Sequence, residues 1–362
     1  MTSTPSAPDP ERRPRVVVTF RERMRATYLA PADLARLTGF ADVEWVPAPD
    51  GEGGRGLGAV APELSPELLR AVADADALLV CAGAPRVDAR LLEAAPRLRV
   101  VGELEGDRFA HRLDMAALEA RGITVLDTTN GSSYPVAEWA LALMLVAMRN
   151  AGHEFRRMIG GEVGQDRNHA GYQFGELTGK RVGLVGCGHI GRRLLEFLRP
   201  FGCEVRVHDP YLAPEVADIY GFTRTSLEHA FRGSDVVTCL APLTTRTRGM
   251  SGRTELDWLP ANAAFVNVSR GAIVDSAALI ERLKRGDGVR AALDVFEPEP
   301  IPADSEIRRL PNVFLTPHIA GSNAESRPRF FSLMVDDLER FFAGHVPRYV
   351  LDDRSIANRQ GR

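Results

Sequence analysis

Three side chains suited to acid–base and carboxylate chemistry follow apolar runs in the second half of the chain. Arg270 lies in "NVSRGAIVD", Glu299 in "ALDVFEPEP" and His318 in "FLTPHIAG". A histidine exchanges protons near neutral pH, and a neighbouring carboxylate favours its charged form. An arginine can hold a carboxylate with paired hydrogen bonds and can stabilise charge on a carbonyl oxygen. Together, these three side chains suit proton transfer to or from an oxygen atom of a substrate that also carries a carboxylate.

His318 by itself would not attract attention, because its own stretch holds no acidic residue and no second histidine. An ordinary histidine between a strand and a loop is the simpler interpretation until its surroundings are considered. Those surroundings are six short apolar runs, at 181–186, 203–208, 235–240, 263–268, 289–295 and 312–316. Six parallel strands form a complete dinucleotide-binding sheet, and ligands bind beyond the carboxyl ends of such strands. Since Arg270, Glu299 and His318 follow the fourth, fifth and sixth runs, we expect them to meet at one edge.

The first half of the chain has the same alternation of apolar runs and helical patterns. Strands are predicted at 15–20, 43–47, 77–82, 98–102 and 123–127, and helices at 66–73, 88–95 and 114–121. This alternation indicates an α/β fold with parallel sheets covered on both faces. A length of 362 residues suggests two domains. The segment 50–58 is expected to be a surface loop.

A glycine motif opens the second set of runs, in "RVGLVGCGHIGRRLLEFL". Gly186, Gly188 and Gly191 have the G-x-G-x-x-G spacing, which is weak evidence alone but here follows a strand and begins a helix. The glycines allow a tight turn and a close approach of the backbone to a pyrophosphate, which then meets helix N-terminal amides. His189 and Ile190 are expected to contribute mainly backbone groups. The motif predicts a dinucleotide cofactor.

The choice of dinucleotide depends on Asp209, which lies 18 residues after Gly191 at the end of the second run. A carboxylate there accepts hydrogen bonds from ribose hydroxyls and repels a 2′-phosphate, which favours NAD over NADP. The alternative is an aspartate that only ends the strand before Pro210. Asp294, at the end of the fifth run, could bind the carboxamide. We also expect cofactor contacts from residues at or just after the ends of the third, fourth and sixth runs, namely Ala241, Pro242, Val268, Ser269, Arg270, His318 and Gly321.

Two helices are predicted outside these alternating patterns. The segment 134–150 is apolar almost all round, with Glu138 as the exception, so it should be buried at a domain junction or a subunit interface. We therefore expect a homodimer. The segment 329–345 has helical spacing and follows the sixth strand, when the second domain is already complete. It is expected to return to the first domain, which would make that domain discontinuous.

Composition excludes several classes of protein. A net charge of −3 gives no general attraction to nucleic acid or acidic lipid. The four cysteines, Cys81, Cys187, Cys203 and Cys239, form no C-x-x-C pair. Small buried thiols in a reducing, cytoplasmic compartment are expected rather than disulfides or a metal site. Residues 1–14 are read as a disordered tail, and the longest apolar run, 139–148, is too short to cross a bilayer.

The motifs together resemble the NAD-dependent D-2-hydroxyacid dehydrogenase family. The resemblance covers roughly residues 75–345 and rests on "VAEWALALML", "VGLVGCGHIGRRL", "HDP", "PLTTRTRGM", "NVSRGAIVD", "ALDVFEPEP" and "LTPHIAG", in the order of the family. It implies that Arg270, Glu299 and His318 are the catalytic trio. It also implies that the first domain is flavodoxin-like, binds substrate and closes on the cofactor domain.

The expected architecture is therefore two doubly wound parallel-sheet domains, with a Rossmann NAD-binding domain inserted into a discontinuous flavodoxin-like substrate domain. The substrate domain is expected to comprise 15–129 and 324–350, the NAD-binding domain 130–323, and a flexible tail 351–362.

The expected activity is hydride transfer between NAD(H) and a D-2-hydroxy acid or its 2-keto form. Formate dehydrogenases, which are similar, carry glutamine where this chain has Glu299, so the glutamate favours chemistry that also moves a proton. Two alternatives stay open. One is an NAD-sensing, corepressor-like binding protein, and the other is a dehydrogenase of a different small donor.

The segment "VGELEGDRFAHRLDMAAL", 101–118, departs from the family, whose glycine-rich loop there binds the substrate carboxylate through backbone amides. Here Glu103, Glu105 and Asp107 are acidic, which should disfavour an anionic substrate nearby. Either the carboxylates point to solvent while amides bind, or the substrate is bulky, cationic or rich in hydroxyls. Glu105 and Gly106, with Arg270, are the expected substrate-binding residues.

Overall fold

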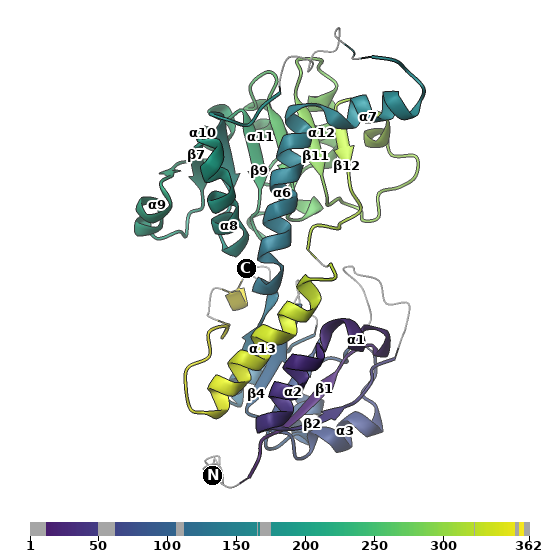
Figure 1. Cartoon of the computed structure of the whole chain (residues 1–362), viewed down its shortest axis with the longest axis vertical. Helices are drawn as coiled ribbons and strands as arrows, with labels where there is room; N and C mark the ends of the chain where they lie inside the picture. The colour runs from purple at the N-terminus through teal and green to yellow at the C-terminus, as the bar shows by residue number, and fades with distance from the viewer. Residues whose placement is uncertain are drawn as a thin grey trace. The chain divides into compact units, whose positions relative to one another are not determined.

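The computed structural model describes residues 12–49, 62–105, 112–164, 166, 175–321, 323–351 and 355–357. They divide into two compact units, and the chain leaves the first, builds the second and returns (Figure 1). Unit 1 holds the described residues up to Gly131 and from Ala324 onward, and unit 2 holds Ser132–Asn323. The insertion of one unit into the other agrees with the predicted architecture.

Unit 1 is built on a five-stranded parallel sheet of order β2-β1-β3-β4-β5, which is the flavodoxin-like order. Its strands are β1 Arg15–Thr19, β2 Asp42–Trp45, β3 Ala77–Val80, β4 Val100–Glu103 and β5 Thr124–Asp127. Its helices are α1 Arg25–Tyr28, α2 Pro31–Phe40, α3 Pro66–Val72, α4 Ala89–Ala94, α5 Met115–Ala120 and α13 Ser326–Phe342, with the 3-10 turn η1 Glu22–Met24.

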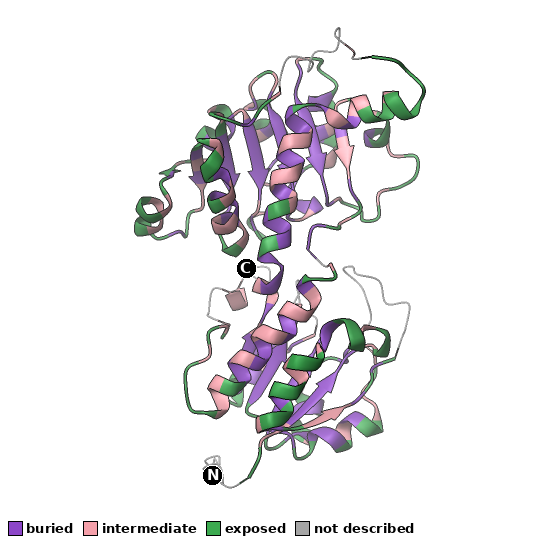
Figure 2. Ribbon diagram, in the orientation of Figure 1, coloured by how far each residue is buried: buried purple, intermediate pink, exposed green. Residues whose placement is uncertain are grey.

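Both faces of this sheet are covered, which explains why inner strands such as β3 are apolar throughout rather than alternating. Val16 and Val18 of β1 face a core shared with Phe331 of α13, whereas Val17 faces a core shared with Leu91 of α4. The central strands β3 and β4 are accordingly buried along their length, whereas the edge strand β2 is exposed or half-buried (Figure 2). The predicted return of the last helix to the first sheet is thus observed in α13.

Unit 2 is built on a seven-stranded parallel sheet of order β12-β11-β10-β9-β6-β7-β8, the Rossmann arrangement with one extra strand. Its strands are β6 Arg181–Val185, β7 Glu204–His208, β8 Thr223–Arg224, β9 Val236–Cys239, β10 Ala264–Asn267, β11 Arg290–Leu293 and β12 Val313–Leu315. Its helices are α6 Ser133–Met148, α7 Ala151–Ile159, α8 His189–Leu198, α9 Pro214–Tyr220, α10 Leu227–Arg232, α11 Arg253–Asp257 and α12 Ser276–Leu283. The 3-10 turns are η2 Thr129–Ser132, which spans the start of this unit, η3 Arg199–Phe201, η4 Gly271–Ile273 and η5 Glu306–Arg309.

The six predicted strands of unit 2 are confirmed, and β8 was missed. Its two residues are exposed at the sheet edge, so they form no apolar run. The predicted tails need correction where they are described. Arg12 pairs with Asp76 at 2.5 Å, and the Leu351 amide donates to the Val125 carbonyl at 3.0 Å, so both segments are held to unit 1. Most of the predicted tail 1–14 and all of the predicted loop 50–58 lie outside the described residues.

Helix α6 packs one side against α8 and the sheet of its own unit, which buries Ala140 and Met144 completely. Its other side remains only half-buried and carries a stripe of apolar residues, formed by Trp139, Leu141, Ala142, Leu145 and Val146. The packing inside unit 2 therefore covers only part of α6, and burial of its other side at a domain junction or a subunit interface stays a prediction. No helix among the described residues is long and apolar enough to cross a membrane.

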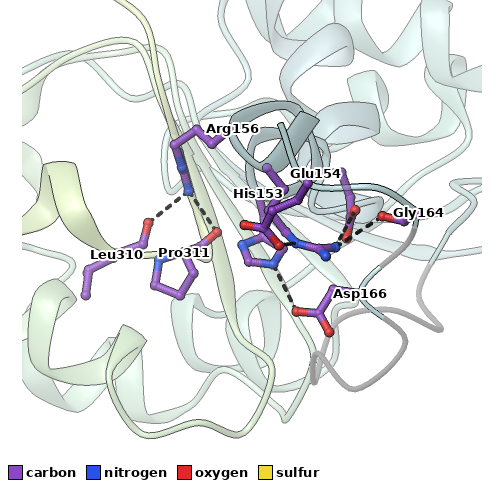
Figure 3. Close-up of polar contacts among 9 residues, drawn as sticks. His153, Glu154, Arg156, Gly164, Asp166, Leu310 and Pro311 are labelled. Atoms are coloured by element: carbon purple, nitrogen blue, oxygen red, sulfur yellow. Dashed lines mark hydrogen bonds and ion pairs between the residues drawn. The ribbon is translucent and has the colours of Figure 1, made fainter. Parts of the chain in front are cut away.

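Helix α7 is fastened to the segment before β12 by one arginine (Figure 3). The Arg156 guanidinium donates to the carbonyls of Leu310 at 3.1 Å, Pro311 at 2.9 Å and Val313 at 3.0 Å. Phe155, Met158 and Ile159 of the same helix are more than 60 % exposed. A fixed helix thus presents apolar side chains to solvent.

Candidate active site

The glycine motif forms the turn between β6 and α8. Gly186 has φ +93°, and a Cβ atom there would lie 2.7 Å from the Ala241 amide nitrogen, so only glycine fits. Helix α8 begins at His189 directly after Gly188, which leaves its first amides pointing out of the turn. Gly191 is buried on the first turn of this helix, close to the Gly186 carbonyl. The turn has the shape that a pyrophosphate needs.

Asp209 lies just beyond β7 and braces this turn. Its carboxylate accepts the Cys187 amide at 2.9 Å and the Tyr211 amide at 3.0 Å. A carboxylate thus stands beside the glycine turn, where ribose hydroxyls would be expected. Arg206 is engaged elsewhere, because it donates to the Gly233 carbonyl at 2.6 Å and pairs with Glu204.

The loops after β9 and β10 are tied together beside the turn. The Ser269 hydroxyl donates to the Ala241 carbonyl at 2.8 Å. Asn267 accepts the Ser269 amide and donates to the Arg270 carbonyl, both at 3.0 Å, which holds the chain through Val268. Sequence reasoning did not single out Asn267, although an amide at a strand end is a common turn residue. The Pro242 carbonyl accepts the Thr247 hydroxyl at 2.6 Å.

Arg270 comes directly after this turn and precedes a close backbone contact. A Cβ atom at Gly271 would lie 1.8 Å from the Phe296 carbonyl carbon, so the loops after β10 and β11 touch. This contact places Arg270 near the loop that carries Glu299. Its charge contributes to the lowered pKa of Glu299, as described next.

Glu299 and His318 form a direct pair, with 2.5 Å between Glu299 Oε1 and His318 Nδ1. Burial by itself would raise the pKa of Glu299, but the hydrogen bond and charge of His318, a backbone hydrogen bond and the charge of Arg270 together lower it. The side chains are 24 % and 34 % exposed for His318 and Glu299, so small molecules can reach the pair. The carboxylate occupies Nδ1, which directs Nε2 to the opposite side of the ring.

The loop that carries His318 is held by Asp294, a fully buried residue at the end of β11. Its carboxylate accepts the Thr316 hydroxyl at 2.6 Å and the amides of Ile319 and Ala320 at 3.0 Å each. The Trp139 indole of α6 donates to the Thr316 hydroxyl at 3.3 Å. The sequence offered no indication of Thr316 or Trp139, because these contacts join distant segments.

The predicted residues of the second half therefore come together in unit 2. Arg270, Glu299 and His318 gather at the carboxyl edge of β10, β11 and β12, while the glycine turn and Asp209 lie at the same edge of β6 and β7. Gly321 is buried close to the His318 loop. Within the described residues, no three His, Cys, Asp or Glu side chains gather to hold a metal ion.

The predicted substrate-binding residues lie in unit 1. Glu103 is fully buried at the end of β4 and paired with Arg112, so it does not point to solvent. Glu105 follows it and accepts a hydrogen bond from the buried Tyr28 hydroxyl. Gly106 and Asp107 lie outside the described residues. Of the two described carboxylates in the acidic segment, Glu103 is therefore neutralised by Arg112, and Glu105 is hydrogen-bonded to the Tyr28 phenol.

These features define a dinucleotide-binding protein equipped for proton transfer. They are a Rossmann sheet, a glycine turn with an aspartate beside it, and a histidine–carboxylate pair at the same edge. Comparison with known proteins leads to the same class of protein. Residues 141–320 match the NAD-binding domain of the D-isomer specific 2-hydroxyacid dehydrogenases. The chain belongs to the D-isomer specific 2-hydroxyacid dehydrogenase family, and its cofactor is NAD.

Individual relatives show the extent of the match. A glyoxylate reductase of Aeropyrum pernix is 34 % identical over 81 % of this chain and 88 % of its own length. A D-3-phosphoglycerate dehydrogenase of Methanocaldococcus jannaschii is 33 % identical over 80 % of this chain, but the chain spans only 54 % of that relative. The crystal structure of the TT0316 protein from Thermus thermophilus has a TM-score of 0.69 at 29 % identity, covering 93 % of this chain and all of that one.

Proposed function

We propose that this protein is an NAD-dependent oxidoreductase that interconverts a D-2-hydroxy acid and its 2-keto acid. The observation that carries the proposal is the Glu299–His318 pair at 2.5 Å, at the carboxyl edge of an NAD-binding sheet. NAD, when bound, supplies or accepts the hydride. The residues of the chain must bind it, hold the substrate and move one proton.

We assign these tasks to named residues. Gly186, Gly188, Gly191, His189 and Ile190 would form the pyrophosphate cradle, with Asp209 at the ribose and Ala241, Pro242, Val268, Ser269, Asp294 and Gly321 lining the cofactor. His318 would give its proton from Nε2 to the oxygen of the forming alcohol, and take it back in the reverse direction. Glu299 would favour the imidazolium and hold the ring. Arg270 would bind the substrate carboxylate and stabilise charge on the carbonyl oxygen.

We further propose that residues 15–129 and 324–350, which lie in unit 1, form the substrate domain, and that residues 130–323, nearly all of which lie in unit 2, form the NAD-binding domain. We propose that Glu105 and Gly106, with Arg270, bind the substrate, and the Glu105 carboxylate, which accepts the Tyr28 hydroxyl, would suit a substrate that carries an ammonium, guanidinium or hydroxyl donor. Charged groups that are partly removed from water are stabilised by such a donor.

We infer that the protein acts as a homodimer in the cytoplasm. Support for the homodimer comes from the half-buried apolar stripe of α6 and the exposed apolar residues of α7. Support for a reducing compartment comes from the four free cysteines, three of which are buried.

The experiment that tests the proposal is NADH oxidation, followed by absorbance, with glyoxylate, hydroxypyruvate, pyruvate and 2-keto acids that carry a cationic or hydroxylated side chain. Turnover of at least one of them is expected. If NADH binds but none is reduced, an NAD-sensing binding protein would explain the site better. If oxidation occurs only with another class of donor, the chain would be a dehydrogenase of that donor.

A further inference from the structure

The backbone of His318 has a conformation that needs support. Its φ is +55°, a region that residues with side chains rarely adopt and that is strained for most of them. The adjacent Ile319 is 48 % exposed, so packing of that neighbour contributes little. Hydrogen bonds to the loop supply support on both sides of His318.

Those hydrogen bonds converge on Asp294. Its carboxylate accepts the Thr316 hydroxyl on one side of His318 and the amides of Ile319 and Ala320 on the other. The loop is also closed on itself, since the His318 amide donates to the Thr316 carbonyl at 3.0 Å. Position 316 is thus the point at which the loop, the buried carboxylate and His318 are joined.

The direction of each hydrogen bond at Thr316 is determined by its partners. A carboxylate only accepts and an indole nitrogen only donates. The single Thr316 hydroxyl proton therefore goes to Asp294 at 2.6 Å, and a lone pair of the same oxygen accepts the Trp139 indole at 3.3 Å. Trp139 consequently orients the hydroxyl toward Asp294, and chains of this kind strengthen each member.

We propose that Trp139 is a positioning residue for His318, acting from α6 through Thr316 and Asp294. This inference rests on the proposed function, because it assigns His318 the proton transfer. The indole of Trp139 donates to Thr316, so its effect on His318 passes through that hydroxyl. Without its indole N–H, the Thr316 hydroxyl loses one of its two partners, its hydrogen bond to the buried carboxylate weakens, and His318 departs from its productive position. Small displacements of a reacting group have large effects on rate.

The test is a double-mutant cycle with conservative changes. Trp139→Phe removes the indole N–H but keeps an aromatic ring, and Thr316→Val removes the hydroxyl but keeps the shape. Trp139→Phe is expected to lower kcat for keto-acid reduction by about 5-fold, the value of one hydrogen bond. Thr316→Val is expected to lower it by about 10-fold to 100-fold. KM should change less than kcat in both.

Because Trp139 acts through Thr316, the reductions in kcat caused by Trp139→Phe and Thr316→Val should not multiply when the two substitutions are combined. The double variant should be no slower than Thr316→Val. Thr316→Ser, which keeps the hydroxyl, should retain nearly all activity. Trp258→Phe is the matched control, since that indole lies in the same unit against Phe231 and Arg232 and makes no hydrogen bond among the described residues. Its kcat should equal that of the wild type.

A second measurement needs no substrate and separates this inference from the proposed function. The rate of His318 modification by diethyl pyrocarbonate, followed by mass spectrometry of the folded protein, should rise in Trp139→Phe and in Thr316→Val, again without multiplication in the double variant. Multiplicative losses, or a Trp139→Phe variant that behaves like Trp258→Phe in both measurements, would overturn the inference. Absence of turnover in the wild type, together with the expected modification rates, would instead count against the proposed function alone.

Discussion

His318 Nδ1 lies 2.5 Å from Glu299 Oε1, across a gap of 19 residues in the chain. The two side chains come from the loops after β12 and β11, which are neighbouring parallel strands. Strand pairing therefore brings the carboxylate to the ring. The pairing leads directly to the first two predictions.

Replacement of His318 by alanine removes the proposed proton donor. We expect kcat for keto-acid reduction to fall by about 10²–10⁴. NADH binding, measured by fluorescence, should change little, because the glycine turn and Asp209 are untouched. Near-normal turnover would show that His318 is only a residue of the loop.

Glu299→Gln should change the pH dependence of the reaction. The lowered pKa of Glu299 keeps it ionised throughout the range in which histidines titrate, so it stabilises the imidazolium that reduction needs. In the wild type, kcat/KM for reduction is lost above a certain pH, because the imidazolium loses its proton. Loss of the Glu299 charge should shift this limit to a lower pH. Glu297→Gln removes a carboxylate from the same exposed loop and should leave the profile unchanged. Superimposable profiles for Glu299→Gln and wild type would show that the pair is not coupled.

Asp209 should determine the choice of cofactor. We expect much higher kcat/KM with NADH than with NADPH, because the carboxylate repels a 2′-phosphate. Asp209→Asn should narrow this ratio. It should also weaken NADH binding, since the side chain accepts the Cys187 and Tyr211 amides beside the turn. Equal use of the two cofactors by the wild type would contradict the assignment.

The chain should be a dimer at micromolar concentration, as measured by light scattering. The half-buried stripe of α6 is the expected contact, and a two-fold pairing is the commonest closed arrangement. Leu145→Glu places a charge in the stripe and should shift the protein toward monomer. Ile219→Glu on α9, at a position that is 70 % exposed, is the control and should not. A wild type that is monomeric under these conditions would refute the prediction.

Glu105 should contribute to the choice of substrate side chain. Glu105→Gln is expected to lower kcat/KM by about 10-fold for 2-keto acids with a cationic side chain, since hydrogen bonds to charged groups contribute roughly 1.5–3 kcal/mol. Plain substrates such as pyruvate should be affected much less. Tyr28→Phe, which removes the phenol that donates to Glu105, should weaken the same preference. An equal loss with all substrates would assign Glu105 a purely structural role.

The sequence alone determined the two parallel sheets and their carboxyl edges, because strands buried on both faces must be continuously apolar. It also determined the cofactor turn, since only glycine fits at Gly186. The gathering of Arg270, Glu299 and His318 followed from the rule that parallel strands end at a common edge. The strand β8 was not predictable, because two exposed residues carry no apolar pattern.

Only the tertiary structure decided which polar groups pair with one another. It paired the buried Glu103 with Arg112, and it joined Trp139 to Asp294 through Thr316, 177 residues further along the chain. Such contacts depend on how segments that are distant in the sequence pack together, so they cannot be predicted from the spacing of residues within one segment.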